Sequence, residues 1–575
     1  MSAFFRPYRT LIRGILVQTS ALSVGGCPGP ESTPEECYRD GAGRLTIPGT
    51  SLAGAMIETA ARLFPNLIGP NLKKTLLEGK ITGKRPFLPP QRHPSEQEED
   101  FFQSVWRFSN AHPVDENLHT EWRQGVGIRQ ATGASATEKR ALYDFECVPI
   151  GARWKFLLEI NTHQGGQEAE ALAILTLNEW VGGRCWLGRG SARGPGWFRL
   201  DQVEILRLPS SQEFLELWPD ATTTPWDAFD GVSKKCSDKP TWNSAVQQAW
   251  TIVKQRQWQL GQWHYLIIPV RIPVGLAPDG YGLNPLHVGG HPAGQWEMNI
   301  PGLLQPLSAA GPDWRGEQFQ PPDAPFVATK PISSPTSPSQ PQWQPFLPGS
   351  SLRGPLRHTV SRLARALGRQ VADPNAPPAT DPEAQRFRTA LKEKQKTQAH
   401  LADEVVRQLA DPVTQIFGLE ECCSRILISD ALLCPPDPGT SCSTKPSFVL
   451  VRTEHHAEDE FTAGVYGTGK FDCDLLVAGT FQFQIVLEAP SLMELHKMVQ
   501  WLAPALELAR LGHLPIGGAK WQGAGWIPWQ IGPMQIVRIG QQPVGESSTD
   551  PQTALFDLPI ASRWTCFFQQ FAGGN

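Results

Sequence analysis

The sequence predicts a protein of mixed α and β structure that is built from two similar modules. Two observations predict this class. A Pro-Gly turn that opens an amphipathic helix occurs twice, at residues 47–54 and 347–354. Strand-like stretches precede and follow both turns in the same order, and a glycine-rich loop closes each series. Because an internal repeat indicates that one module was used twice, we expect two α/β modules with anion-binding loops.

The two helix starts are nearly identical. One reads Ile-Pro-Gly-Thr-Ser-Leu-Ala-Gly from Ile47, and the other reads Leu-Pro-Gly-Ser-Ser-Leu-Arg-Gly from Leu347. Taken alone, such a start is weak evidence, because capped helices after Pro-Gly turns are common. We expect hydroxyl side chains to cap both helices, so that backbone N–H groups point outward and suit a phosphate. The capping pairs are Thr50 with Ser51 and Ser350 with Ser351.

The elements around the turns pair in one order. Before the turns, residues 11–17 and 24–26 correspond to residues 265–270 and 287–290. After the turns, the matching pairs are 106–111 with 426–431, 123–146 with 452–474, 149–156 with 477–483, and 188–197 with 517–526. Matching elements in one order are more specific than any single motif, so the repeat extends over most of both halves.

This series of elements resembles the RAMP superfamily of CRISPR proteins. More narrowly, it resembles the Cas-seven-type backbone subunits of type III effector complexes, here fused in tandem. The resemblance implies an α+β fold of two ferredoxin-like (RRM-like) modules, each with a projecting β-hairpin and a glycine-rich loop. It also implies a guide RNA (crRNA) laid along the backbone, a complementary target RNA cut at intervals, and other CRISPR effector subunits as partners.

The repeat sets the expected domain limits. We expect a first RAMP backbone module at residues 1–209 and a Trp-rich linker at 210–260 that contains a short helix. A second module with an expanded first loop is expected at 261–545, followed by a C-terminal tail at 546–575. Because the linker would fix the spacing of two modules on one guide, its length is expected to be functional.

Basic patches are the expected RNA contacts. The formal net charge is −4, so nucleic-acid binding must come from local clusters of charge. Arginines interleave with glycines in the first glycine-rich loop, whereas those on the second helix fit a solvated helix face equally well. With the resemblance, the expected RNA-binding residues are Thr50, Ser51, Arg189, Arg193, Ser350, Ser351, Arg353, Arg357 and Lys520.

The resemblance implies a catalytic aspartate in the first loop of members that cut RNA. The second module has the expected D-x-P-like setting at Asp323-Ala324-Pro325, so Asp323 is our first choice. Since the RNA 2′-hydroxyl can itself attack in line, the protein would supply mainly geometry and charge stabilisation. Without the resemblance, a loop aspartate that fixes a turn before proline would be the better interpretation.

The first module departs from this pattern. Its loop lacks D-x-P, and its candidate substitutes are Glu35, Glu36 and Asp40, with Arg39 facing a phosphate. Asp40-Gly41 also has an ordinary interpretation as a turn. One module is therefore a candidate to cut RNA and the other to hold it.

Two hairpins are expected to act as thumbs that wedge into the guide and target duplex, again by resemblance. They span residues 128–142 and 461–471, and the candidate thumb residues are Ile128, Phe461 and Tyr466. A base can lie against an apolar or aromatic side chain of this kind. An exposed hairpin with an incidental aromatic residue is the alternative.

Cysteine usage favours reduced thiols and a cytoplasmic protein. The eleven cysteines include no C-x-x-C pair, which argues against a disulfide framework or a structural zinc site. We identify no set of metal-ligating residues, and a divalent cation such as Mg²⁺ is the open candidate for a cofactor. No apolar run reaches the ~18 residues of a membrane span, so no membrane partner is expected.

Three functions stay open at this point. The favoured one is a backbone subunit of a type III CRISPR complex that binds crRNA and acts as an endoribonuclease on target RNA in antiviral defence. The second is the same scaffold without catalysis. The third is an endoribonuclease that processes precursor crRNA unaided, which would depend on general acid-base groups such as histidine.

Overall fold

A computed structural model describes most of the chain. The described residues are 9–25, 36–67, 76–77, 80–81, 100–101, 104–115, 118–128, 142–208, 225–275, 284–289, 303–304, 326–332, 343–376, 381–397, 403–434, 448–458 and 465–540.

One antiparallel sheet organises the first part of the chain, here called the first unit (residues 9–208). Its strand order is β4-β7-β1-β9-β8. Its main elements are β1 (Arg9–Gln18), α1 (Gly49–Leu63), β4 (Trp106–Phe108), β7 (Arg153–Ile160), α3 (Thr162–Val181), β8 (Cys185–Trp186) and β9 (Trp197–Leu208). Because β1 lies between β7 and β9, the βαββαβ connectivity is consistent with a ferredoxin-like fold.

The second unit (residues 264–540) has the same arrangement. Its strand β17 pairs with β14 on one side and β10 on the other, and β10 pairs on its far side with β18 and β19, all antiparallel. These elements are β10 (His264–Val274), α7 (Gly349–Ala366), β14 (Ile426–Ile428), β17 (Val465–Ala489), α11 (Leu492–Arg510), β18 (Gln530–Ile531) and β19 (Gln535–Arg538). The expected α+β class is confirmed.

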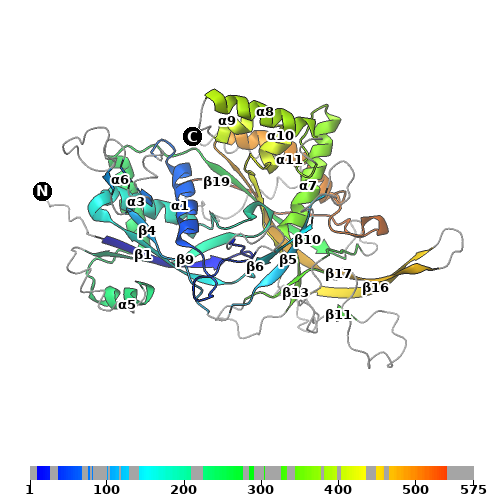
Figure 1. Cartoon of the computed structure of the whole chain (residues 1–575), viewed down its shortest axis with the longest axis horizontal. Helices are drawn as coiled ribbons and strands as arrows, with labels where there is room; N and C mark the ends of the chain where they lie inside the picture. Colours follow the sequence, from blue (N-terminus) through cyan, green and yellow to red (C-terminus); the bar gives the residue numbers. More distant parts are fainter. Residues whose placement is uncertain are drawn as a thin grey trace.

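The structure describes further elements in both halves of the chain. In the first half these are β2 (Lys80–Ile81), β3 (Asp100–Phe101), β5 (Glu121–Val126), β6 (Leu142–Cys147), η2 (Ser191–Arg193), α5 (Pro225–Lys235) and α6 (Trp242–Gln255). In the second half they are β11 (Leu303–Leu304), β12 (Ala328–Thr329), β13 (Gln344–Leu347), α8 (Pro382–Thr397), α9 (Asp403–Gln408), α10 (Pro412–Phe417), β15 (Ala431–Leu433), β16 (Phe448–Glu458) and η4 (Lys520–Gln522). The strands β16 and β17 form a long hairpin that extends away from the rest of the molecule (Figure 1).

The two units share a packed seam. Alternate residues of β10 point to opposite faces of its sheet, as expected for a strand. Leu266 and Ile268 lie in the core of the second unit, whereas Tyr265 lies in the core of the first. Leu427 and Val486 also join the first core, so the outer face of the second sheet packs against the first unit.

Among the described residues, two ion pairs cross this seam. Arg62 of α1 contacts Glu488 at the end of β17, with 2.8 Å between Nη1 and Oε2. Arg123 of β5 contacts Asp430, with 2.6 Å between Nη1 and Oδ2, and both side chains are buried. Removing one partner of such a buried pair leaves an uncompensated charge, so these contacts fix how the units meet.

The Trp-rich connector is more than a spacer. Helix α6, expected near its end, packs along α3 and places Ala245, Ala249 and Val253 in the first core. Helix α5 covers the other face of the first sheet, where Phe229 and Val232 meet Leu206. The connector therefore stabilises the first unit, since its apolar side chains complete two faces of that unit. The predicted boundary at residue 209 stays a prediction.

Candidate nucleic-acid interface

Both helix starts have a different cap from the one we expected. The N-cap residues are Pro48 and Pro348, and neither helix has a side-chain cap from its own first turn. The expected hydroxyl caps are wrong, because the helices begin one residue before Thr50 and Ser350, which places the hydroxyls inside the first turn. Within the described residues, no hydrogen bond is recorded for the hydroxyls of Thr50, Ser51, Ser350 or Ser351.

A side chain from the neighbouring strand end takes over the capping. The Gly49 amide donates to Asn110 Oδ1 and the Gly349 amide donates to Asp430 Oδ1, both at 2.9 Å. Asn110 and Asp430 follow β4 and β14, which occupy the same place in the two units. The capping interaction is therefore repeated, although its chemistry differs in charge.

The glycine-rich loops are held by matching hydrogen bonds. In each unit, two amides of the loop donate to carbonyls in the segment after the first strand. The pairs are Arg189 to Ser23 at 2.8 Å and Gly196 to Ala21 at 2.6 Å in the first unit, and Gly518 to His287 and Gly525 to Pro285, both at 2.8 Å, in the second. The two loops therefore dock in one way against equivalent segments.

Glycine is required at the first turn of both loops. Gly188 and Gly517 have φ values of 78° and 75°, in the left-handed region. A Cβ atom at these positions would lie 2.4 Å from the Ser23 carbonyl oxygen and 2.1 Å from that of His287. Only glycine fits there, which explains the glycine pattern of the sequence.

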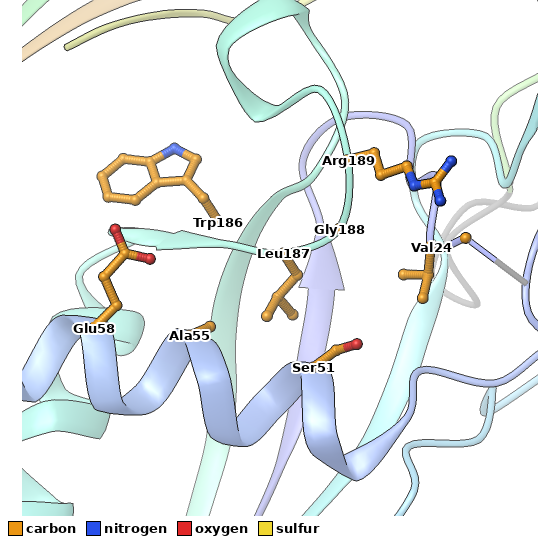
Figure 2. Close-up of a pocket in the computed structure, with 9 residues that line it drawn as sticks. Val24, Ser51, Ala55, Glu58, Trp186, Leu187, Gly188 and Arg189 are labelled. Carbon is orange, nitrogen blue, oxygen red and sulfur yellow. The ribbon is translucent and has the colours of Figure 1, made fainter. Parts of the chain in front are cut away.

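An open pocket lies between α1 and the glycine-rich loop of the first unit (Figure 2). Its volume is about 390 Å³, and its lining residues are Val24, Gly25, Ser51, Ala55, Glu58, Trp186, Leu187, Gly188 and Arg189. Two predicted RNA-binding residues, Ser51 and Arg189, thus share one pocket, while Thr50 is exposed beside it. The guanidinium suits a phosphate and the Trp186 ring suits a base.

Arg193 lies where the two units meet. Its loop contacts the start of α7, because a Cβ on Gly349 would lie 2.7 Å from the Arg193 carbonyl oxygen. Its Nη1 donates to the Tyr143 hydroxyl at 3.2 Å. Arg193 also acts electrostatically on Arg353 and Arg357 of α7. Three predicted RNA-binding arginines therefore come together at the seam.

Arg357 is not on a solvated helix face. It is 6% exposed and donates from Nη1 to the Gly418 carbonyl at 2.8 Å, while Arg353 donates to the Phe417 carbonyl. These carbonyls end α10, where a positive charge is favourable. Burial, with the neighbouring Arg357 and Arg193, lowers the pKa of Arg353 to about 9, and burial lowers the pKa of Arg357 to about 10. The two guanidiniums are therefore held by backbone carbonyls, and the carboxylates of Asp411, Asp373 and Asp381 also act on Arg357.

In the first unit, two of the candidate catalytic residues, Asp40 and Arg39, have structural partners. Asp40 Oδ1 accepts from the amides of Ala42 and Arg44, at 2.9 and 3.0 Å, and Oδ2 pairs with the Arg44 guanidinium. The Arg44 amide is the main cause that lowers the pKa of Asp40. Arg39 pairs with Glu146 at 2.5 Å, and Glu36 is exposed. This geometry holds the loop in a turn.

The first loops of the units can be placed in register. An isolated bridge joins Gly25 to Cys37 in the first unit, and an equivalent bridge joins Gly289 to Phe326 in the second. In the first unit the Glu146 carboxylate accepts a hydrogen bond from the amide of Cys37. In the second unit the Asp474 carboxylate accepts one from the amide of Phe326.

When the two bridges are aligned, the first loops of the two units have different residues at matching positions. Asp323 itself lies outside the described residues, three positions before Phe326 in the sequence. Three positions before Cys37 the sequence has Pro34. The first unit therefore has no carboxylate in the register of Asp323, and the assignment of Asp323 stays a prediction.

The thumb residues are only partly described. β5 and β6 pair as an antiparallel hairpin, and Ile128 just beyond β5 is 43% exposed. Asn375 of the second unit donates to the Ile128 carbonyl at 2.8 Å. Phe461 lies outside the described residues, and Tyr466 belongs to β17. Their thumb role stays a prediction.

Lys520, another predicted RNA-binding residue, is exposed at the start of η4.

Sequence reasoning missed two residues of this surface. Trp186 lines the pocket, and its position just before the glycine-rich loop was the signal available. His287 lies inside the repeated segment 287–290, at the position where the first unit has a serine. Only the matching hydrogen bonds of the two loops show that these two residues correspond.

In the part of the chain that is described, no group of three or more His, Cys, Asp or Glu could hold a metal ion. Nor does any described helix have the length and apolar character needed to cross a membrane.

The comparison with protein families supports the resemblance for part of the chain. Residues 19–199 match the model of the RAMP superfamily. The matched part runs from the end of β1 into β9, so it contains α1, the pocket and the first glycine-rich loop. None of the curated proteins compared with the chain matches it. The match supports RAMP superfamily membership and, in general terms, a CRISPR-associated RNA-binding subunit.

Proposed function

We propose that this protein is a backbone subunit of a type III CRISPR effector complex, made of two RAMP modules in tandem. In this proposal it binds crRNA along both units and cleaves complementary target RNA in the second, in antiviral defence. The observation that carries the proposal is the repeated loop. The second unit has the connectivity of the matched first unit and the same hydrogen bonds around its glycine-rich loop.

The surface chemistry favours RNA. The pocket of the first unit combines the Arg189 guanidinium, the Ser51 hydroxyl and the Trp186 ring. The exposed Arg193 follows at the seam, whereas Arg353 and the buried Arg357 are bonded to backbone carbonyls behind it. Single-stranded nucleic acid is bound by positive charge along its backbone and aromatic rings against its bases. A strand that passes from the first pocket to the second glycine-rich loop would cross this seam.

Cleavage is proposed for the second unit. A carboxylate at Asp323 would orient the ribose 2′-hydroxyl for in-line attack on the adjacent phosphate. The structural engagement of Asp40 and Arg39 favours a first unit that holds RNA without cutting it. A scaffold without any cleavage is therefore the second candidate, and the Asp323 variant below distinguishes the two.

The direct test is to identify the bound RNA. The chain is purified with its co-expressed neighbouring subunits, and the RNA that it retains is sequenced. RNAs that share one repeat-derived end and carry varied spacer sequences are expected. Retention of bulk cellular RNA without such ends would contradict the proposal, and cleavage of precursor RNA by the chain alone would favour a processing enzyme.

Removing two arginines of the first loop should weaken guide binding. We expect Arg189→Ala with Arg193→Ala to reduce affinity for single-stranded RNA and to make it less salt-dependent, because fewer counterions are released. The slope of log K against log salt should fall by up to about 1.4, which is ~0.7 for each phosphate that an arginine no longer neutralises. Fluorescence anisotropy across a salt titration measures it.

A matched control removes the same charge elsewhere. Lys234 and Lys254 are exposed on α5 and α6, outside the glycine-rich loop in the sequence. Lys234→Ala with Lys254→Ala should leave the slope near its parental value. Equal slopes for all three proteins would refute the role of the loop arginines.

A further inference from the structure

The glycine-rich loops of the two units differ at one position, and the residue that faces this position differs as well. The matching hydrogen bonds make His287 the counterpart of Ser23, and Gly518 the counterpart of Arg189. The matching bridges make Gly289 the counterpart of Gly25. Where the first unit has an arginine in its glycine-rich loop, the second unit has a glycine. Where the first unit has a serine opposite that arginine, the second unit has a histidine.

Despite these differences, both units have a nitrogen-bearing side-chain group against the corresponding glycine, Gly25 in the first unit and Gly289 in the second. In the first unit the Arg189 guanidinium lies against Gly25, where a Cβ would be 2.8 Å from Nε and Nη2. In the second unit the His287 ring lies between Gly289 and Gly518. A Cβ on Gly289 would be 3.7 Å from Nε2, and one on Gly518 would be 3.1 Å from Cδ2 and 3.9 Å from Nε2. Glycines on both sides leave Nε2 the space that a side chain would fill.

The tautomer of His287 follows from its partner. Nδ1 lies 2.9 Å from the carbonyl oxygen of Asp474, and a carbonyl oxygen can only accept a hydrogen bond. Nδ1 therefore carries the hydrogen, and Cys473 Sγ at 3.3 Å lies beside the same atom. In the neutral ring this leaves Nε2 as a hydrogen-bond acceptor. Among the described residues no donor to Nε2 is recorded.

The ring is held rigidly. Its side is covered by Phe326, with ring centroids 6.4 Å apart at 88°, and the residue is only 8% exposed. Asp474 behind it is fully buried and pairs with Arg452. An acceptor that is fixed in this way selects a donor by position, because it loses little freedom on binding.

We propose that His287 Nε2 accepts a hydrogen bond from a ribose 2′-hydroxyl of bound RNA at the second glycine-rich loop. The inference rests on the proposed function, since it presumes that RNA follows this loop. Arg189 at the equivalent place can only donate, which suits a phosphate oxygen. His287 accepts, and the 2′-hydroxyl is the backbone donor that RNA has and DNA lacks. The second unit would therefore read the sugar where the first reads the phosphate.

The test compares RNA and DNA. The chain, purified with its neighbouring subunits and freed of bound RNA, is titrated with a labelled single-stranded RNA and with the DNA of the same sequence. We expect His287→Ala to weaken RNA binding by about 3- to 10-fold, the worth of one hydrogen bond. DNA binding should not change. Equal losses for RNA and DNA would show a phosphate contact and overturn the proposal.

A second variant separates contact from support. An asparagine at position 287 can still donate to the Asp474 carbonyl but has no atom at the place of Nε2. We expect His287→Asn to bind RNA as weakly as His287→Ala and to melt at the parental temperature. Parental RNA affinity in His287→Asn would show that the ring only supports the fold. A wild-type complex that binds no RNA would instead refute the proposed function.

Discussion

A complex that carries Asp323→Ala is expected to bind guide and target RNA normally and to lose one target cleavage position. An acidic side chain adds nothing favourable to phosphate affinity, so its removal should spare binding. Its loss removes the group that would orient the 2′-hydroxyl, and a positioned group of this kind contributes about 100-fold or more to the rate. Target RNA labelled at one end should therefore lose a single band of its cleavage ladder.

Asp40→Ala is the matched control in the first unit. Asp40 holds its turn through two backbone amides and Arg44. In the sequence it comes three positions after the bridge residue Cys37, whereas Asp323 comes three positions before Phe326. We expect this variant to keep the whole ladder. A full ladder from the Asp323→Ala complex would show that the second unit is a scaffold, and loss of a band with Asp40→Ala would place catalysis in the first unit instead.

The order of elements was predictable from the sequence because turn and loop chemistry is local. A Pro-Gly pair before a periodic helix, and glycines in the left-handed region at Gly188 and Gly517, leave the same marks in both halves. The helix α6 was also predictable, because its apolar residues recur at helical spacing. These features depend on a few neighbouring residues.

Contacts between distant residues were not predictable in this way. The caps of α1 and α7 come from Asn110 and Asp430. These residues form hydrogen bonds with the Gly49 and Gly349 amides although they are 61 and 81 residues away in sequence. The burial of Arg357 depends on α10, which packs against α7. The role proposed for His287 depends on comparing two loops in three dimensions. Long-range partners of this kind leave no periodic signal.

Asp430→Ala is expected to cause the largest loss of stability. Asp430 is 6% exposed and serves two groups at once: its Oδ1 caps α7 through the Gly349 amide, and its Oδ2 pairs with Arg123 of the first unit. Removal would leave the Arg123 guanidinium buried at the seam without its carboxylate. Breaking a buried pair on one side costs about 3–5 kcal/mol of the free energy of unfolding. Urea-induced unfolding measures the loss.

Asn110→Ala removes the equivalent cap in the first unit. Asn110 accepts from the Gly49 amide at the same 2.9 Å. Its loss should therefore cost only about 1 kcal/mol, as for other helix caps. A similar loss in both variants would mean that Asp430 acts as a cap alone.

The double variant Arg123→Ala with Asp430→Ala isolates the contact across the seam. Once the guanidinium is gone, the carboxylate has no buried cation to neutralise, so the double variant should lose less stability than the two single variants added together. The shortfall is the coupling between the units, and it should exceed about 1 kcal/mol because both groups are buried. Additive losses would show that Arg123 and Asp430 stabilise their own units separately, and the seam would then depend on apolar contacts such as those of Tyr265 and Val486.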